Sequence, residues 1–199
     1  PLVFDIYSFE LCMLMAKSST LVVIPEHLSA FPASILKILE EHKVTFLFWV
    51  PTIMVNIANM DLLSSIQLPA LKTVWFAGEV FPTKQFNYWR KMLPQTTFAN
   101  LYGPIEITLD CTCFIVNREI KDEESIPIGF PCRNTDILIL DADNKLVTEA
   151  GKEGELCVRG TSLAMGYYNN PEKTASAFVQ NPLNHAYPET IYRTGDVVV

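Results

Sequence analysis

Basic residues are scarce in this 199-residue sequence: 15 Lys and Arg stand against 22 Asp and Glu, for a net charge of -7. Nucleic-acid binding depends on clustered Lys and Arg that neutralise phosphates, so a nucleic acid is excluded as the expected partner. Charged residues of both signs make up only 19% of the chain, whereas 49% is hydrophobic. This balance excludes a disordered segment and predicts a globular protein with a buried core.

The sequence also lacks an uninterrupted apolar run that could span a membrane. Residues 44–60 carry no charge, which is about the shortest length for a spanning helix, but Pro51 lies in their middle. Proline in a helix interior costs roughly 3 kcal/mol. We therefore interpret the run as a buried strand over residues 44–49, followed by a helix that begins at Pro51, with no membrane span.

Cysteine and histidine are few and scattered. The five cysteines include no C-x-x-C pair, and the three histidines lie far apart, so neither a zinc site nor a nucleophilic triad can be assembled from them. Dispersed thiols in odd number are typical of a protein in the reducing cytoplasm, where we expect this one. The chain begins with Pro rather than Met and shows no basic targeting region, so we expect a piece of a longer protein.

Short apolar strands alternate with helical segments in the first part of the chain. We expect helices at residues 5–16, 29–42, 82–92 and after Pro51, and strands at residues 20–24, 44–49, 71–76 and 96–101. Such alternation is typical of an α/β fold with a parallel, helix-covered sheet, whose ligands bind beyond the carboxyl ends of the strands. After residue 125 short strands and turns predict a small β-rich, barrel-like subdomain. We therefore divide the chain into an α/β subdomain over residues 1–124 and a β-rich subdomain over residues 125–199.

Three segments carry polar and aromatic residues that a ligand could use. In the run NLYGPIE, residues 100–106, the Tyr102 ring followed by Gly103 would let a flat aromatic ligand stack while the backbone comes close. Glu106 in the same run supplies a carboxylate suited to Mg²⁺. Residues 154–171 contain further Gly turns, and Asp196 follows another and could hold two ribose hydroxyls. Taken singly, each segment is also typical of an ordinary turn with solvated charges.

Five runs, taken in chain order, resemble motifs of the adenylate-forming ligase superfamily: FDIYSFE, FAGE, NLYGPIE, GELCVRGTSLAMGYYNNPEKT and YRTGD. The resemblance reaches from Phe4 to Asp196 and looks most like the amino-acid adenylation domains of nonribosomal peptide synthetases and the D-alanine–carrier protein ligases. It implies an enzyme that uses ATP and Mg²⁺ to activate a small amino acid, with D-alanine the first candidate, as an aminoacyl-adenylate. It also implies a carrier protein, whose phosphopantetheine thiol then takes the acyl group.

The resemblance further implies a central fragment of such a ligase. The family's phosphate loop would precede the first residue, and its hinge and its lid with the catalytic lysine would follow Val199. We therefore expect no catalytic residue within these 199 residues and no adenylate formation by them alone.

Substrate-binding residues are implied position by position. Asp5 would pair with the substrate's α-amino group, and this charge pairing would select amino acids over plain carboxylic acids. The alternative is that Asp5 only caps the helix that begins there. The side-chain pocket would be lined by mostly bulky apolar residues and one carboxylate: Phe9, Phe48, Trp75, Ala77, Leu101, Leu109 and Asp110. If the alignment behind Trp75 is off by one position, this side chain would instead point into the core on the other face of the sheet.

The nucleotide would lie along the ends of the predicted strands. Asn100 and the Leu101 carbonyl would meet the adenine amino group, Glu106 would bind Mg²⁺, and the ribose would be held by Asp196. Further nucleotide-binding positions are implied for Gly78, Glu79, Tyr102, Gly103 and Ile105. At the position of Ile105 the family usually carries Thr, whose hydroxyl meets the α-phosphate. This sequence therefore lacks one hydrogen-bond donor that the family pattern has.

Two alternatives compete with amino-acid activation. An acyl- or aryl-CoA ligase would share the motifs, but its substrate has no amino group for Asp5 to pair with. A non-catalytic nucleotide-binding relative is favoured by the lost hydroxyl at Ile105. For the substrate itself, the run FAGEVFP and the bulky pocket favour a D-alanine-type residue, whereas Asp110 would suit a cationic side chain.

Overall fold

The computed structural model describes residues 5–199 and divides them into two compact units. The first unit contains the chain up to Tyr102 together with Cys113–Gly129. The second contains Gly103–Thr112 and Phe130–Val199. The segment Gly103–Thr112, which we placed in the α/β subdomain from the sequence, thus groups with the β-rich unit.

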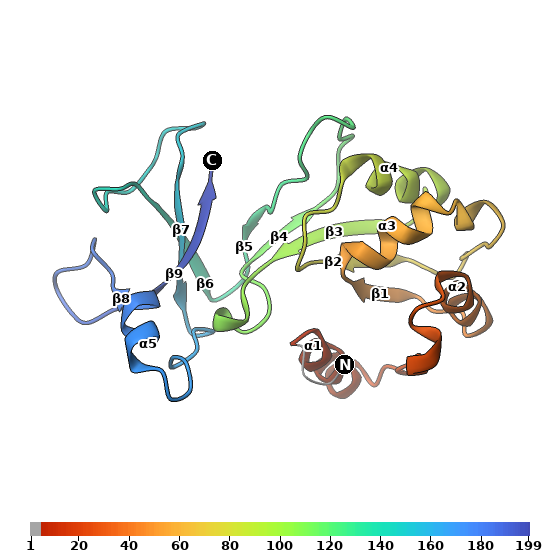
Figure 1. Ribbon diagram of the computed structural model, residues 1–199, viewed down its shortest axis with the longest axis horizontal. Helices are drawn as coiled ribbons and strands as arrows, with labels where there is room; N and C mark the ends of the chain where they lie inside the picture. Colours follow the sequence, from red (N-terminus) through yellow and green to blue (C-terminus); the bar gives the residue numbers. More distant parts are fainter. Residues whose placement is uncertain (1–4) are drawn as a thin grey trace. The chain divides into compact units, whose positions relative to one another are not determined.

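The first unit is built on a sheet in which β1 (Phe46–Trp49), β2 (Thr73–Phe76), β3 (Thr97–Tyr102) and β4 (Thr112–Ile115) are neighbours in that order. The pairs β1–β2 and β2–β3 are parallel, with Phe48 opposite Trp75 and Trp75 opposite Ala99. The predicted parallel α/β fold is confirmed, because each parallel connection passes through a helix (Figure 1).

Helices cover this sheet: α1 (Ile6–Lys17), α2 (Pro32–Glu41), α3 (Pro51–Asn59) and α4 (Thr83–Met92), with short 3₁₀ turns η1 (Glu26–Leu28) and η2 (Leu62–Ser64). On one face of the sheet, Phe76 of β2 shares a buried core with Met54 of α3 and Trp89 of α4. The Trp89 indole N–H donates to the Met54 carbonyl at 2.9 Å, which satisfies the ring's only polar group inside the core.

The uncharged run at residues 44–60 forms β1 and then α3, with Pro51 at the helix start as predicted. Proline fits the first helical turn because the amide it lacks has no partner there. Within residues 5–199, no helix combines the length and the apolar character that a membrane crossing requires.

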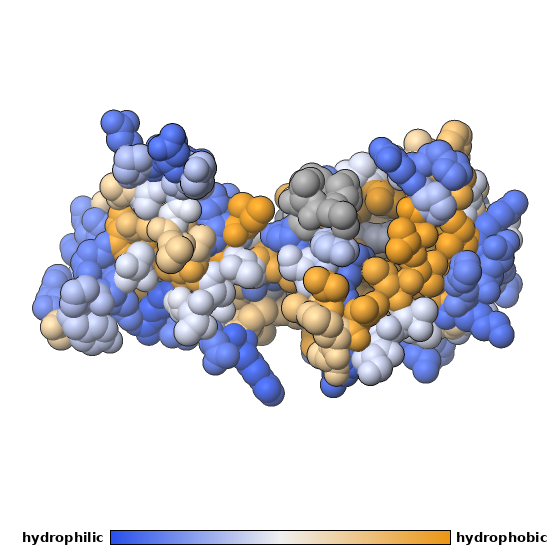
Figure 2. Space-filling model, turned by 90° about the horizontal axis from the view of Figure 1, so that it is seen from below, coloured by the Kyte–Doolittle hydropathy of each residue, from blue (hydrophilic) through white to orange (hydrophobic). Residues whose placement is uncertain are grey.

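One predicted strand is wrong. Residues 20–24 form no strand, and the whole stretch 18–25 lies outside regular secondary structure. A strand needs a neighbour to pair its backbone amides and carbonyls, and this run pairs with none among the described residues. Its side chains Leu21 and Val23 are exposed, as are several of α1. Figure 2 shows apolar residues gathered on the face of the first unit that is seen from below.

The second unit is β-rich, as predicted. It begins with the 3₁₀ turn η3 (Ile105–Ile107) and continues with β5 (Phe130–Pro131), β6 (Thr135–Leu140), β7 (Gly154–Gly160), α5 (Pro171–Ala177), β8 (Phe178–Gln180) and β9 (Thr190–Val198). Four of its strands form an antiparallel sheet in the order β6-β7-β9-β8 (Figure 1). Leu140, Cys157 and Ile191 form one buried hydrophobic cluster of this unit.

Candidate functional site

Three of the predicted substrate-pocket residues lie together in the first unit. The ring of Phe9, from α1, lies 5.4 Å from the Phe48 ring and 5.1 Å from the Trp75 ring, measured between centroids. Phe48 and Trp75 stand opposite each other on the paired strands β1 and β2, and their ring centroids are 6.0 Å apart. Val74 and Phe76 belong to the core on the opposite face of the sheet, so Trp75 lies on the face that α1 covers. The alternative of a shifted register, in which Trp75 would be a core residue, is therefore not what the structure shows.

Sequence reasoning missed one member of this aromatic cluster. The ring of Phe46 lies 5.7 Å from Phe9 and 5.2 Å from Trp75. The signal was present, because residues two apart on a strand point to the same side, and Phe46 stands two positions before Phe48. We define the aromatic cluster as Phe9, Phe46, Phe48 and Trp75.

Asp5 stands at the start of α1 but does not cap it through its side chain. Its backbone occupies the N-cap position, and the carboxylate accepts no hydrogen bond from the first turn. Phe9 follows four residues later, which is about one helical turn, so the two positions lie on the same side of the helix. The carboxylate therefore remains available for a partner other than its own helix.

Glu79, at the end of β2, has a structural partner that the sequence did not reveal. Its Oε2 accepts a hydrogen bond from the Thr52 amide at 3.0 Å and another from the Thr52 hydroxyl. Gly78 precedes it with φ +88°, a conformation that glycine adopts without a Cβ penalty. The run FAGE thus turns the chain and places a carboxylate on the N-terminal turn of α3.

Asn100 is held in one orientation near the end of β3. Its side chain is almost wholly buried, and its amide nitrogen Nδ2 donates to the Pro127 carbonyl at 2.9 Å. A carbonyl oxygen can only accept, so the nitrogen must face Pro127 and the oxygen Oδ1 must face the other way. An amide oxygen in this position can accept from an amino group such as that of adenine. Leu101 is buried beside it and Tyr102 is half-buried.

At Gly103, in the second unit, the backbone packs so closely against another part of the chain that only glycine fits. A Cβ placed there would overlap the Leu109 carbonyl oxygen and lie 2.5 Å from the Asp110 Cα. We expected from the sequence that this glycine admits a ligand, whereas the close approach seen here is to the chain's own backbone. The backbone that it packs against has an unusual conformation, since Leu109 and the residue before it, Thr108, both have positive φ, at 83° and 61°.

Glu106 lies in η3 and is bound by a tyrosine from another segment. The Tyr167 hydroxyl donates to Oε1 of Glu106 at 2.6 Å. Tyr192, in β9, lies near both groups. Burial raises the pKa of Tyr192 well above its usual range, and the neighbouring Tyr167 and the charge of Glu106 raise it further. Both tyrosines stand inside the runs that carry the family resemblance, but their link to Glu106 could not be read from spacing.

Glu106 fits a magnesium ion that arrives with a nucleotide. Within residues 5–199 no three His, Cys, Asp or Glu side chains are grouped as a complete metal site. Mg²⁺ typically keeps several waters and binds through one or two carboxylates together with substrate phosphates. A single carboxylate held in place by the Tyr167 hydroxyl meets that requirement. Its neighbour Ile105 is 62% exposed, so the residue is not part of the core.

Asp196 lies within β9 and not after a turn as the sequence indicated, in a stretch that is fixed by an ion pair. Glu155 receives three hydrogen bonds from this stretch: one from the Arg193 Nε at 2.9 Å, one from the Arg193 Nη2, and one from the Gly195 amide at 3.1 Å. The Asp196 amide donates to the Thr194 hydroxyl oxygen at 3.0 Å. Asp196 itself is exposed, so it stands at the surface of the second unit.

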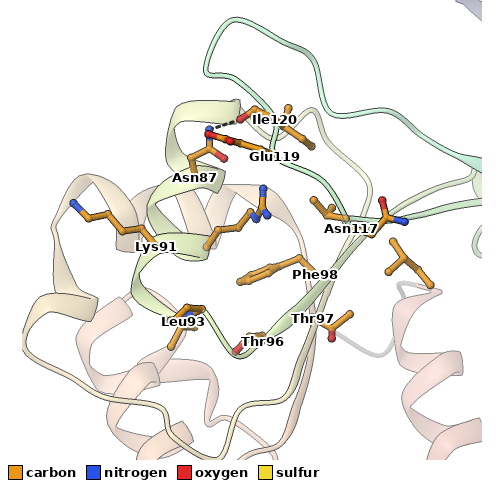
Figure 3. Close-up of a pocket in the computed structure, with 13 residues that line it drawn as sticks. Asn87, Lys91, Leu93, Thr96, Thr97, Phe98, Asn117, Glu119 and Ile120 are labelled. Atoms are coloured by element: carbon orange, nitrogen blue, oxygen red, sulfur yellow. Dashed lines mark hydrogen bonds between the residues drawn. The ribbon is translucent and has the colours of Figure 1, made fainter.

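A separate hollow of about 700 Å³ lies in the first unit, around the end of α4 and the beginning of β3. Figure 3 shows Thr96, Thr97 and Phe98 on one side of it and Lys91 on another. None of the predicted site residues lines this hollow. It lies at the opposite end of β3 from Tyr102, so it does not belong to the candidate site.

Comparison with known proteins gives consistent matches. Residues 1–168 match the family described as AMP-binding enzyme. The zwittermicin A synthase ZmaJ of Bacillus cereus is 31% identical over 204 residues, which cover 100% of this chain and 38% of that protein.

Two solved structures are also similar. The AMPPNP-bound form of the nonribosomal peptide synthetase FmoA3 gives a TM-score of 0.86 at 27% identity, covering 98% of this chain and 21% of that chain. PA1221, a nonribosomal peptide synthetase protein containing adenylation and PCP domains, gives a TM-score of 0.74 at 26% identity. The match covers 83% of this chain and 33% of that chain. The chain thus spans 38% or less of each of these three proteins.

Proposed function

The chain belongs to the AMP-binding enzyme family, and on this premise we propose that it activates an amino acid with ATP, yielding an aminoacyl-adenylate and pyrophosphate. Its fold is that of the adenylation domains of nonribosomal peptide synthetases. The choice of an amino acid rests on Asp5, whose carboxylate makes no capping hydrogen bond and lies one helical turn before Phe9 of the aromatic cluster.

In the proposed reaction, an oxygen of the amino acid's carboxylate attacks the α-phosphorus of ATP, and the bond between that phosphorus and pyrophosphate breaks. Mg²⁺, when bound, neutralises charge on the phosphates. The residues of this chain position the reactants. Asp5 holds the ammonium group, Oδ1 of Asn100 accepts from the adenine amino group, and Asp196 accepts from the ribose hydroxyls.

The aromatic cluster supports a small substrate. Each of its rings has another ring centroid within 5.4 Å, and Phe9 contacts all three partners. Packed rings leave little free volume over β1 and β2. We therefore keep D-alanine, or another small amino acid, as the proposed substrate, with an amino acid of cationic side chain as the alternative that Asp110 favours.

A carrier protein is the proposed acceptor of the activated acid. The similar protein PA1221 contains adenylation and PCP domains in one polypeptide. By extension, the thiol of a carrier protein would attack the carbonyl of the adenylate formed here, forming a thioester and releasing AMP.

A non-catalytic nucleotide-binding protein is the second candidate, and Ile105 favours it. This side chain is exposed next to Glu106 and has no hydroxyl to donate. An acyl- or aryl-CoA ligase is disfavoured, because its substrate would leave the Asp5 carboxylate without an ammonium partner.

Pyrophosphate exchange on the intact protein tests these candidates. The panel contains D- and L-alanine, glycine, lysine, ornithine, and fatty and aromatic acids without an amino group. Exchange with a small amino acid, and none with the plain acids, is the expected result. Exchange with the plain acids alone would establish a CoA ligase-type substrate, and ATP binding without any exchange would establish the non-catalytic protein.

A further inference from the structure

We propose that Tyr167 and Tyr192 are positioning residues that fix the Glu106 carboxylate in the orientation needed for the magnesium ion of Mg–ATP. This inference rests on the proposed function, since it assigns roles to two residues of the same nucleotide site. It assigns neither tyrosine a direct contact with substrate.

The tyrosines near Glu106 come from two distant parts of the chain. Tyr167 stands before α5, and its hydroxyl donates to Oε1 of Glu106 at 2.6 Å, a length typical of a charge-assisted O–H···O⁻ bond. Tyr192 stands in β9, is 6% exposed, and lies near the same carboxylate. A carboxylate accepts up to about four hydrogen bonds or ligands, so the Tyr167 hydroxyl leaves capacity for a cation.

The two tyrosine rings are themselves held by packing. Phe178, the first residue of β8, lies 5.9 Å from the Tyr167 ring and 5.0 Å from the Tyr192 ring. The Lys173 ammonium lies 3.9 Å from the centroid of the Tyr167 ring, within the range of a cation–π contact. With Phe178 and Lys173 against it, the Tyr167 ring has little freedom to turn away from Glu106.

Gly166 explains how Tyr167 reaches this position. Its φ is +134°, and a Cβ there would collide with the side chain of Thr174. The same Thr174 hydroxyl accepts a hydrogen bond from the Tyr167 amide at 2.9 Å. The backbone therefore passes close to α5 at Gly166, and this close passage directs Tyr167 towards η3.

Two further hydrogen bonds hold the same two segments together. The Ala164 amide donates to the Glu106 carbonyl at 2.8 Å, and the Thr108 hydroxyl donates to the Ser162 carbonyl at 2.9 Å. Neither η3 nor the segment 162–167 can move without breaking these bonds. The carboxylate is thus ordered before a metal arrives, which is how groups behind a metal ligand raise its affinity.

The test is Tyr167→Phe in the intact protein, with Tyr168→Phe as the matched control. Tyr168 is the next residue and is 101% exposed, so its hydroxyl contacts neither the core nor Glu106. Calorimetry measures the affinity for ATP without metal and at increasing Mg²⁺, and paramagnetic resonance measures the binding of Mn²⁺ to the ATP complex. These measurements need no turnover.

We expect Tyr167→Phe to weaken Mg²⁺ and Mn²⁺ affinity of the ATP complex roughly tenfold or more. Affinity for metal-free ATP should stay unchanged, and Tyr168→Phe should behave as the wild type. Glu106→Gln serves as the reference for complete loss of the metal ligand. If Tyr167→Phe does not fold, Tyr192→Phe is measured in the same way, with the same expected loss.

Two failures can be told apart. Wild-type protein that binds Mg–ATP, together with a tyrosine variant whose metal affinity is within twofold of wild type, would overturn the positioning roles alone. An equal loss of affinity for metal-free ATP would also overturn them, because a general structural defect affects both measurements. Wild-type protein that binds no ATP would overturn the proposed function and this inference with it.

Discussion

The Glu79 carboxylate accepts two hydrogen bonds from Thr52, one from the backbone amide and one from the hydroxyl. Thr52 lies in the first turn of α3, whose own N-cap residue, Val50, has no side chain that could accept a hydrogen bond. A residue 27 positions away in sequence therefore serves as the cap of this helix, and it joins the end of β2 to the start of α3.

Glu79→Ala should lower the free energy of unfolding by about 1–2 kcal/mol, because it removes both the cap and a favourable charge at a helix N-terminus. Chemical denaturation measures the change. Glu123→Ala, at an exposed turn position of the same unit, is the control and should change stability by less than about 0.5 kcal/mol. Equal stability of both variants would show that the Thr52 contact adds nothing.

Ile105→Thr should raise the rate of adenylate formation with little change in stability. The hydroxyl would donate to the α-phosphate, and a hydrogen bond to a charged group contributes about 1.5–3 kcal/mol, or roughly tenfold to a hundredfold in rate. Since Ile105 is 62% exposed, the alternative that the hydroxyl would be buried in the core does not apply. Both residues are β-branched, so the backbone preference is retained.

The kcat of pyrophosphate exchange and the melting temperature are measured together on the intact protein. Ile105→Val controls for the change in size without adding a hydroxyl. An unchanged kcat in Ile105→Thr would indicate that a backbone amide already serves the α-phosphate.

Much of the fold could be predicted because local signals and tertiary structure agree. Pro51 separates β1 from α3 as the sequence indicated, since proline restricts the backbone wherever it stands. Residues 20–24 show the limit of such signals: β-branched and apolar residues favour a strand, but a strand forms only where a partner supplies hydrogen bonds.

The sequence singles out candidate ligand-binding residues, which stay predictions, but it does not reveal the residues that support them. Asn100 and Glu106 stand in recognisable runs, whereas the Pro127 carbonyl and the Tyr167 hydroxyl that orient them lie 27 and 61 positions further along the chain. Pattern reasoning works over a helical turn or a strand pair, and contacts of this separation depend on the complete fold.

Gly103→Ala should destabilise the second unit by about 3 kcal/mol or prevent folding, because the added methyl overlaps backbone that cannot move aside. Gly151→Ala is the control, because the space within 4 Å of its Cβ position is open. Its positive φ of 81° alone makes alanine unfavourable there, by about 1 kcal/mol. The two free energies of unfolding are compared by urea titration. A smaller loss for Gly103→Ala than for Gly151→Ala would contradict the packing role.

Thiol reactivity should rank the cysteines by exposure. Cys12 is exposed, whereas Cys111 and Cys157 are buried. Burial raises the pKa of Cys111 to about 12 and that of Cys157 to about 11, so both stay protonated at pH 8, where the reactive thiolate would be needed. Alkylation at pH 8 followed by peptide mass analysis should find Cys12 modified first, and the two buried thiols modified only in denaturant. Early modification of Cys111 would contradict its burial.

Asp5→Ala should abolish selection for amino acids while leaving the protein folded. The carboxylate makes no capping hydrogen bond, so its loss should change the free energy of unfolding by less than about 0.5 kcal/mol. If it pairs with a buried substrate ammonium, removing it costs roughly 3–5 kcal/mol of binding. Calorimetry with the preferred amino acid measures the affinity, and Glu10→Gln controls for a changed charge on the same helix. Affinity within about twofold of wild type would show that Asp5 does not hold the substrate, and the case for an amino acid over a plain carboxylic acid would lose its physical basis.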